Sequence, residues 1–398
     1  MKHIFYLLDG FSPLALKKQK SQIYKNKKQN YIDTLSDNSL FFENCYGYGE
    51  TYPTVYSMIN GQDIYKSYCD APEILSSFKE NYSLLNYYKS KNYKTIYFRN
   101  VKSHYPTHGF YKRFNKSFAE KFDYYCLKKE NQKFDLKNFM KLNKFFEKYK
   151  KDNIFYFIHD MSFHDNQKVY DGSINQHLNA LKYTSNIVKK NLKILNYNKS
   201  TDTLFFLSDH GLSAKPFNKI HTQKFLKNYE YENYYKSMFL DEKIKFTFFI
   251  KSPNKHKKKF TQFLDPQDVF NTILYFNRNK FKKFVKKTGK HLKKSITISL
   301  KNARGSIYGN FILKNIFHFH FIKITLKEKF IYSYKHKDEY IIERNGSFKK
   351  VNMNSFDKEF LNRISNYYGK KNLLIKSIFF LLSFAYKVPS RIIKKLFK

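Results

Sequence analysis

Carboxylate and imidazole side chains follow two apolar runs of the chain, at the points where those runs end. Asp209 and His210 follow the apolar residues 204–207 after Ser208, and Asp160 and His164 follow the apolar run 154–158. Such side chains together are ligands for borderline divalent cations such as zinc and manganese. The alternative is that Asp209 and the glycine after His210 only terminate a strand, as these residue types commonly do.

Two further residues could take part in the same chemistry. Asp9 ends the first apolar run, residues 3–8, where it is either a turn residue or a metal ligand. Thr51 follows a glycine-containing loop and stands just before a short predicted helix with Pro53 in its first turn. The N–H groups and dipole of a helix start favour an anion there. The alternative is that Thr51 or Thr54 only caps the helix.

A strand–helix–strand pattern must position the two Asp/His pairs. Residues 153–158 and 203–207 are apolar runs typical of strands that are buried on both faces. Between them, apolar residues recur at steps of three, four and seven from Ile174 to Leu195, which predicts one long amphipathic helix. Because such a unit has parallel strands, we expect both Asp/His pairs at the same edge of the sheet.

The remaining pattern divides the chain into three parts. Residues 1–288 alternate strand and helix patterns, which predicts an α/β domain with a mostly parallel sheet flanked by helices. Within it, residues 254–259 have the composition of a basic linker. Residues 289–370 are expected to form a small antiparallel subdomain. Its strands are predicted at 295–300, 310–314, 318–325, 329–334 and 340–343.

The third part, residues 371–398, is expected to be a basic amphipathic helix. Its apolar stretch 378–386 is followed by basic residues, namely Lys387, Arg391, Lys394, Lys395 and Lys398. This pattern is typical of a helix that lies in a membrane interface. Residues 373–398 therefore either make a peripheral membrane contact or pack on the domain.

Lysine dominates the charge of the chain. Its 398 residues include 75 Lys and Arg against 32 Asp and Glu, a formal net charge of +43. A basic excess can indicate nucleic acid or anionic lipid as a partner. Because lysine is spread along the whole chain together with Asn, Ile, Phe and Tyr, it indicates a general residue bias, and nucleic acid is not the expected partner. Anionic lipid or an anionic substrate fits such a surface better.

Apolar content and cysteine count bound the class of protein further. Apolar residues make up 42% of the chain, and 43 Phe and 35 Tyr supply most of the core. Three cysteines without metal-type spacing fit a reducing compartment. The apolar start at 4–8 is too short for a signal peptide, and no run reaches the ~20 apolar residues of a spanning helix. We therefore expect a cytoplasmic protein, at most peripheral at a membrane surface.

In the order and spacing of its motifs, the chain resembles the sulfatase-like branch of the alkaline phosphatase superfamily over about residues 1–280. Residues 51–61, Thr-Tyr-Pro-Thr-Val-Tyr-Ser-Met-Ile-Asn-Gly, resemble the sulfatase signature Cys-x-Pro-Ser-Arg-x-Ser-Leu-Leu-Thr-Gly, with Thr51 at the nucleophile position. Residues 208–211 resemble the family's second metal motif, and Asp9 matches its first metal acid. The resemblance implies an alkaline-phosphatase-like central sheet.

The chain also departs from the sulfatase pattern. Sulfatases mature a Cys or Ser to formylglycine and usually carry an Arg four residues later, whereas this chain has Thr51 and Val55. Gly10 replaces the usual second N-terminal Asp. A Thr nucleophile resembles instead the phosphodiesterases, phosphopentomutases and phosphoethanolamine or phosphoglycerol transferases of the superfamily. The motif Asp160-x-x-x-His164 resembles that of its nucleotide pyrophosphatase/phosphodiesterases.

By this resemblance the site would hold one or two divalent cations, zinc or manganese. Asp9, Thr51, Asp209 and His210 would surround one cation, and Asp160, His164 and His221 a second. Metal coordination is one of the few ways to activate a threonine hydroxyl, and two cations can clamp the attacking and leaving oxygens. The intermediate would be a phosphothreonine, resolved by water or by a sugar hydroxyl. With one cation only, His164 and His221 would bind substrate or protonate the leaving group.

Three functions remain open from the sequence. The favoured one is a metal-dependent hydrolase or transferase of phosphate mono- or diesters that acts on a surface glycan or lipid precursor. The expected partner is then an anionic small-molecule, glycan or lipid-linked ester. The second is sulfuric ester hydrolysis, against which Thr51 argues. The third is a catalytically silent basic binding protein with the same fold.

Overall fold

A computed structural model shows the fold of the chain. It describes residues 1–19, 27–49, 51–62, 83–99, 118–127, 153–164, 174–211, 241–253, 257–278, 296–301, 319–325, 327–333, 339–344 and 347–352. Within these ranges, no helix has the length and apolar character needed to cross a membrane. The predicted helix at 371–398 and the predicted strand at 310–314 lie outside the described residues, and the three-part division of the chain stays a prediction.

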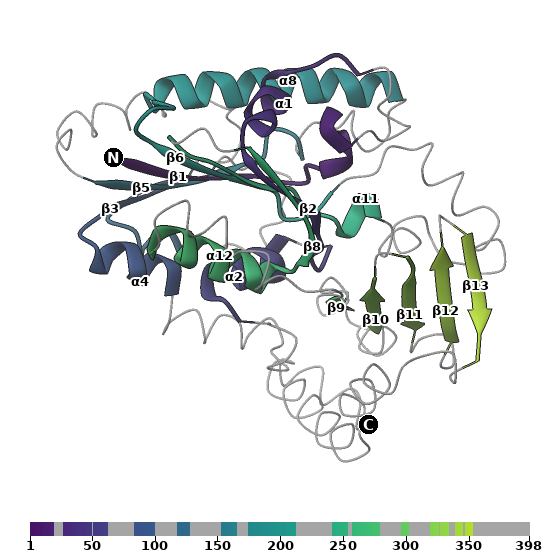
Figure 1. Cartoon of the computed structure of the whole chain (residues 1–398). Helices are drawn as coiled ribbons and strands as arrows, with labels where there is room; N and C mark the ends of the chain where they lie inside the picture. Colours follow the sequence, from purple (N-terminus) through teal and green to yellow (C-terminus); the bar gives the residue numbers. More distant parts are fainter. Residues whose placement is uncertain are drawn as a thin grey trace, which may run out of the picture.

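An eight-stranded sheet crosses the centre of the molecule in the order β4-β3-β5-β1-β6-β7-β2-β8 (Figure 1). The strands are β1 Lys2–Leu8, β2 Leu40–Cys45, β3 Lys94–Arg99, β4 Tyr124–Leu127, β5 Ile154–Asp160, β6 Thr203–Leu207, β7 Phe248–Lys251 and β8 Lys258–Leu264. Among these described strands, β7 runs antiparallel to its neighbours β6 and β2, and the other pairings are parallel. The predicted mostly parallel sheet is confirmed.

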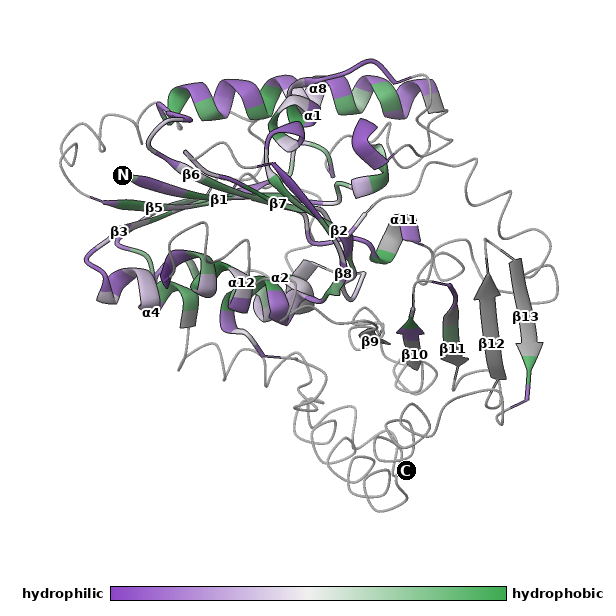
Figure 2. Ribbon diagram, in the orientation of Figure 1, coloured by the Kyte–Doolittle hydropathy of each residue, from purple (hydrophilic) through white to green (hydrophobic). Residues whose placement is uncertain are grey.

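Helices cover both faces of this sheet. Figure 1 shows α1 (Tyr31–Asp37) and α8 (Ile174–Ile194) on one face, and α2 (Thr51–Asn60), α4 (Ser83–Ser90) and α12 (Pro266–Arg278) on the other. The short elements η1 (Pro13–Ala15), η2 (Lys17–Gln19) and α11 (Asp241–Ile244) lie in connections. In Figure 2, α8 alternates hydrophobic and hydrophilic colours along its length, as expected of an amphipathic helix that packs one side on the sheet.

Side-chain alternation along the central strands divides the core into two layers. Phe5, Phe157 and Phe205 belong to the buried cluster that includes residues of α2, α4 and α12. Tyr6 and Ile158 belong to the other cluster, which includes residues of α1 and α8. Because successive residues of a strand point to opposite faces, this alternation also decides which way each polar side chain at a strand end points.

A second sheet of five strands has the order β13-β12-β11-β10-β9, and its described pairings are all antiparallel. Its strands are β9 Ile296–Lys301, β10 Phe319–Ile324, β11 Lys329–Ser333, β12 Glu339–Arg344 and β13 Ser347–Val351. The predicted antiparallel arrangement is therefore correct. The last strand, β13, was not predicted from the sequence.

Candidate active site

The parallel register of three central strands brings their carboxyl ends together. Strand β1 lies between β5 and β6, with Leu8 opposite Asp160 on one side and Leu7 opposite Leu207 on the other. The polar residues that follow these strands therefore meet at one edge of the sheet, as open α/β sheets commonly arrange their ligand sites.

Asp9, Asp209 and His210 form a buried cluster at this edge. Each offers one ligand atom, and these three atoms all lie within 4.8 Å of one another. Nε2 of His210 is 3.4 Å from Oδ2 of Asp209 and 3.9 Å from Oδ1 of Asp9. The exposed fraction is 0% for both aspartates and 4% for the histidine, so the cluster is almost fully shielded from solvent.

Backbone contacts hold this cluster in position. Oδ1 of Asp209 accepts hydrogen bonds from the N–H groups of Gly10 and His210, each at 2.9 Å. Nδ1 of His210 lies 3.0 Å from the carbonyl oxygen of Gly211. Because a carbonyl only accepts, Nδ1 carries the proton, and Nε2 of the neutral ring turns its lone pair toward the carboxylates. Such outer contacts are typical of metal-ligating side chains.

Two carboxylate oxygens of the cluster indicate what it could bind. Oδ1 of Asp9 and Oδ2 of Asp209 are buried, and neither has a hydrogen-bond partner within the described part of the chain. Buried oxygens of this kind are costly unless a cation or a donor compensates them. Together with an imidazole nitrogen they fit one divalent cation of the zinc or manganese class.

Thr51 lies against the same cluster as the first residue of α2. Its Oγ1 is 3.3 Å from Oδ2 of Asp9 and 3.3 Å from Nε2 of His210. The Thr54 hydroxyl, in contrast, accepts a hydrogen bond from the backbone N–H of Tyr48 in the preceding loop. The hydroxyl of Thr51 therefore contacts the site residues directly, which a purely capping role would not require.

His159 is part of the site although the sequence reasoning did not assign it a role. Its Nε2 lies 2.9 Å from Oδ2 of Asp9, and its side chain is almost fully buried. Burial lowers the pKa of His159, and the charge of Arg99 lowers it further, against the opposing effect of Asp9. The signal that could have found it is strand alternation, because His159 stands two residues after Phe157 and shares its face.

Asp9 is ionised in this environment. Burial raises its pKa, but the electrostatic effect of nearby His164 and the hydrogen bond from His159, with further contributions from His159 and His210, outweigh burial. The pKa of Asp9 therefore lies below its ordinary value. The site holds a buried carboxylate with three imidazoles nearby.

His164 reaches the cluster, but Asp160 does not. The rings of His164 and His210 lie 6.4 Å apart between centroids. The Asp160 carboxylate instead accepts hydrogen bonds from the Tyr6 hydroxyl, from Asn191 of α8 and from the N–H of Ser162. Asp160 follows His159 directly and points to the α8 face of the sheet. The structure thus does not bring Asp160 to the cluster of Asp9, Asp209 and His210, and the second metal group of Asp160, His164 and His221 stays a prediction. His221 lies outside the described residues.

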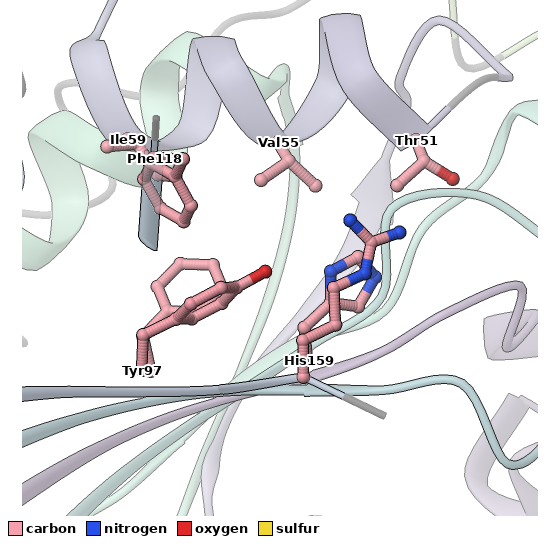
Figure 3. A pocket seen from close by; sticks show the side chains of 8 residues that line it. Thr51, Val55, Ile59, Tyr97, Phe118 and His159 are labelled. Carbon is pink, nitrogen blue, oxygen red and sulfur yellow. The ribbon is translucent and has the colours of Figure 1, made fainter. Parts of the chain in front are cut away.

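A pocket opens beside Thr51 on the α2 face of the sheet. Figure 3 shows Thr51, Val55 and Ile59 along one side of α2, facing Tyr97 and His159 on the strands. The lining is completed by Arg99, Phe118 and Phe157. The pocket is therefore mostly apolar, with Thr51, Arg99 and His159 as its polar groups.

A comparison with known families agrees with this geometry. The model of the sulfatase family matches residues 14–276, which is more than half of the chain. The chain belongs to the sulfatase family. No curated protein sequence matches it. Thr51, Asp209 and His210 lie within the matched residues, and Asp9 precedes them.

Solved structures share the fold of this sulfatase-family chain. A Vibrio parahaemolyticus protein of the alkaline phosphatase superfamily is 12% identical with a TM-score of 0.58, over 91% of this chain and 84% of that one. A 2-O glycosaminoglycan sulfatase is 11% identical with a TM-score of 0.57, over 98% and 94%. A lipoteichoic acid synthase from Listeria monocytogenes is 12% identical with a TM-score of 0.50, over 98% and 93%. The alkaline-phosphatase-like fold is thereby confirmed.

Proposed function

We propose that this chain is a metal-dependent hydrolase or transferase of phosphate mono- or diesters, with Thr51 as its nucleophile. The observation that carries the proposal is the position of the Thr51 hydroxyl, 3.3 Å from both Asp9 and His210. A threonine cannot be matured to the formylglycine that sulfatases use. The family membership supports ester chemistry, and the residue at the nucleophile position favours phosphate over sulfate.

Each residue of the site would have its own role in the proposed displacement at phosphorus. Asp9, Asp209 and His210 would hold the cation, and Thr51 would lie beside it. When bound, a divalent cation supplies positive charge that favours the ionised threonine oxygen and offsets the charge of the phosphoryl group. His159 orients Asp9, and the buried surroundings of the cluster keep water from competing for its charges.

The proposed reaction has two steps. The Thr51 hydroxyl gives its proton to the solvent and its oxygen attacks phosphorus, while the bond from phosphorus to the leaving oxygen breaks and protonated His164 donates its proton to that oxygen. Water or a sugar hydroxyl then gives its proton to the neutral His164 and attacks the phosphothreonine, and the bond from phosphorus to the Thr51 oxygen breaks. Attack by water completes a hydrolysis, and attack by a hydroxyl completes a transfer.

The substrate class follows from the fold relatives and the charge of the chain. Two of the structures that share the fold are a glycosaminoglycan sulfatase and a lipoteichoic acid synthase. Together with a net charge of +43, they support an anionic ester on a glycan or a lipid-linked precursor as the substrate.

A Thr51→Ala variant tests the proposal. The unaltered protein and the variant are assayed on an aryl phosphodiester, an aryl phosphomonoester and an aryl sulfate, each with and without zinc or manganese. We expect metal-dependent turnover of a phosphate ester that falls to background in the variant. Turnover that is unchanged in the variant would rule out Thr51 as the nucleophile. Cleavage of the sulfate ester alone would support sulfuric ester hydrolysis, and a protein without bound metal or turnover would support a silent binding protein.

A further inference from the structure

We infer that Arg99 binds the phosphoryl oxygens of the substrate beside Thr51, in place of the arginine that the sulfatase signature has at the position of Val55. This inference rests on the proposed function and names a substrate-binding residue for it. Arg99 lies in none of the motifs that connect the chain with its family. Its assignment follows from the geometry of the pocket.

Val55 stands at the position where the sulfatase signature has an arginine. It stands four residues after Thr51, so that both side chains project from the same side of the helix. Figure 3 shows this arrangement, with both residues facing the pocket. Valine offers neither charge nor hydrogen-bond donors. Helix α2 therefore brings the nucleophile to the pocket without the positively charged arginine of the sulfatase signature.

Arg99, on the sheet, supplies a positively charged side chain to the same pocket. It is the last residue of β3 and stands opposite His159 of β5 in the parallel register. Its exposed fraction is only 2%, and it lines the pocket together with Thr51, Val55 and His159. Arg99 therefore lines the pocket from the sheet, and the helix that carries the nucleophile lines the same pocket.

The chemistry of this position suits a phosphoryl group. A guanidinium stays charged at all physiological pH values, and its planar set of donors matches two phosphoryl oxygens at once. The start of helix α2 adds backbone N–H groups and a favourable dipole at Thr51. The remaining walls of the pocket are Ile59, Tyr97, Phe118 and Phe157. Because these walls are mostly apolar, the interaction between guanidinium and phosphoryl charge is weakly screened.

Arg99 would act on the charge that spreads over the phosphoryl oxygens during displacement. Removal of one preorganised donor from such a site typically lowers kcat by about 10²- to 10³-fold. An arginine also fixes the orientation of the phosphoryl group, so its loss is expected to weaken binding of the ground state as well. Lysine would keep the charge but lose the two-pronged geometry.

The test compares Arg99→Met and Arg99→Lys in the full, metal-loaded chain. Calorimetry measures the Kd of inorganic phosphate, and steady-state kinetics measure kcat and KM on the aryl phosphodiester. We expect the Met variant to bind phosphate at least ~10-fold more weakly and to lose about 10²- to 10³-fold in kcat/KM. The Lys variant should recover part of both losses. If the Met variant does not fold, the Lys variant should still bind phosphate more weakly than the unaltered protein.

Two further variants serve as matched comparisons. Arg278→Met removes an arginine whose guanidinium lies over the Tyr87 ring, 5.7 Å from its centroid, at the end of α12, and it should leave phosphate affinity unchanged. The double variant Val55→Arg, Arg99→Met returns an arginine to the signature position. It should bind phosphate more tightly than Arg99→Met alone. If it does not, the inference that Arg99 takes the role of the signature arginine is wrong.

The outcomes for Arg99 and for the nucleophile are separable. Thr51→Ala should abolish turnover but retain phosphate binding, because its hydroxyl is not the anion-binding group. Phosphate affinity that is unchanged in Arg99→Met overturns the role of Arg99, whatever the Thr51 variant does. Absence of phosphate binding by the unaltered, metal-loaded protein overturns it as well. Full turnover by Thr51→Ala contradicts the proposed nucleophile alone, and phosphate affinity still decides the role of Arg99.

Discussion

Nε2 of His159 lies 2.9 Å from Oδ2 of Asp9, so that the end of strand β5 holds the carboxylate that follows strand β1. Burial and the charge of Arg99 lower the pKa of His159. The neutral ring then donates its Nε2 proton to Asp9, since a carboxylate only accepts. This bond fixes one oxygen of Asp9 and leaves the other, Oδ1, toward His210.

Loss of this hydrogen bond should weaken metal binding. We expect His159→Leu to raise the Kd for zinc or manganese by about 10- to 100-fold, as is typical for a partner that orients a metal ligand. His159→Gln keeps an N–H donor and should lose less. Competition with a chromophoric chelator measures both values. His3→Phe, which alters a buried histidine near the other end of β1, is the control, and equal metal affinity in all three variants would contradict an orienting role.

Metal removal should lower thermal stability through Asp209 and its neighbours. A ligand that binds only the folded state at 100 times its Kd stabilises that state by about 2.7 kcal/mol. Zinc or manganese should therefore raise the Tm of the unaltered protein, and a chelator should reverse the rise. Asp209→Asn replaces one of the two carboxylate oxygens by an NH₂ group and removes the negative charge. The variant should therefore show no rise in Tm with metal. A Tm that responds equally in the variant would place the cation elsewhere.

Asp160→Asn distinguishes a structural carboxylate from a metal ligand. Because Asp160 accepts its hydrogen bonds on the α8 face, we expect the variant to bind as many metal ions as the unaltered protein. It should lose about 1–3 kcal/mol of unfolding free energy, since a buried acceptor is exchanged in a network with Tyr6 and Asn191. Elemental analysis and urea denaturation measure the two quantities. A lower metal content in the variant would restore Asp160 as a ligand.

Acid should destabilise the fold through His3. Burial, with a smaller effect of the N-terminal amino group, lowers the pKa of His3 from 6.5 to about 4. The unfolded chain therefore binds more protons than the folded one between these values, and the contribution present above pH 6.5 is lost as the pH falls toward 4. The expected loss is about 2 kcal/mol between pH 7 and pH 5.

The variant His3→Phe isolates this contribution. Phenylalanine keeps a ring among Tyr88, Tyr93 and Phe205, and the Tyr88 hydroxyl still accepts a hydrogen bond from Asn277. Urea denaturation of both proteins at pH 7 and pH 5 should show a smaller loss of unfolding free energy for the variant. The same loss in both proteins would assign the acid sensitivity to other groups.

Local sequence patterns were sufficient for the elements that end at the site. The apolar runs of β1, β5 and β6 and the periodicity of α8 are properties of short segments, and their ends placed Asp9, Asp209 and His210 correctly at one edge. Strand β8 was different. Its first residues fall in the segment 254–259, whose basic composition predicted a linker, but pairing with β2 makes this edge segment a strand.

Side-chain direction and long-range pairing account for what the sequence reasoning missed. His159 and Asp160 are adjacent, so only one of them can face the cluster, and the face is decided by how β5 packs between β1 and β3. Arg99 joins the site only because β3 pairs with β5, whose paired residues lie 60 positions apart in the sequence, as do Arg99 and His159. No local pattern contains that information.

The central place of β1 has a consequence for the order of folding. His3 lies opposite Phe155 on one neighbouring strand and Thr203 on the other, so β1 can pair on both sides only after the chain has been synthesised beyond β6. Pairings of such long sequence separation form slowly, because loop closure must precede them. A nascent or partly folded chain would therefore not yet bring Asp9 beside Asp209 and His210, and this cluster would form only with the finished sheet.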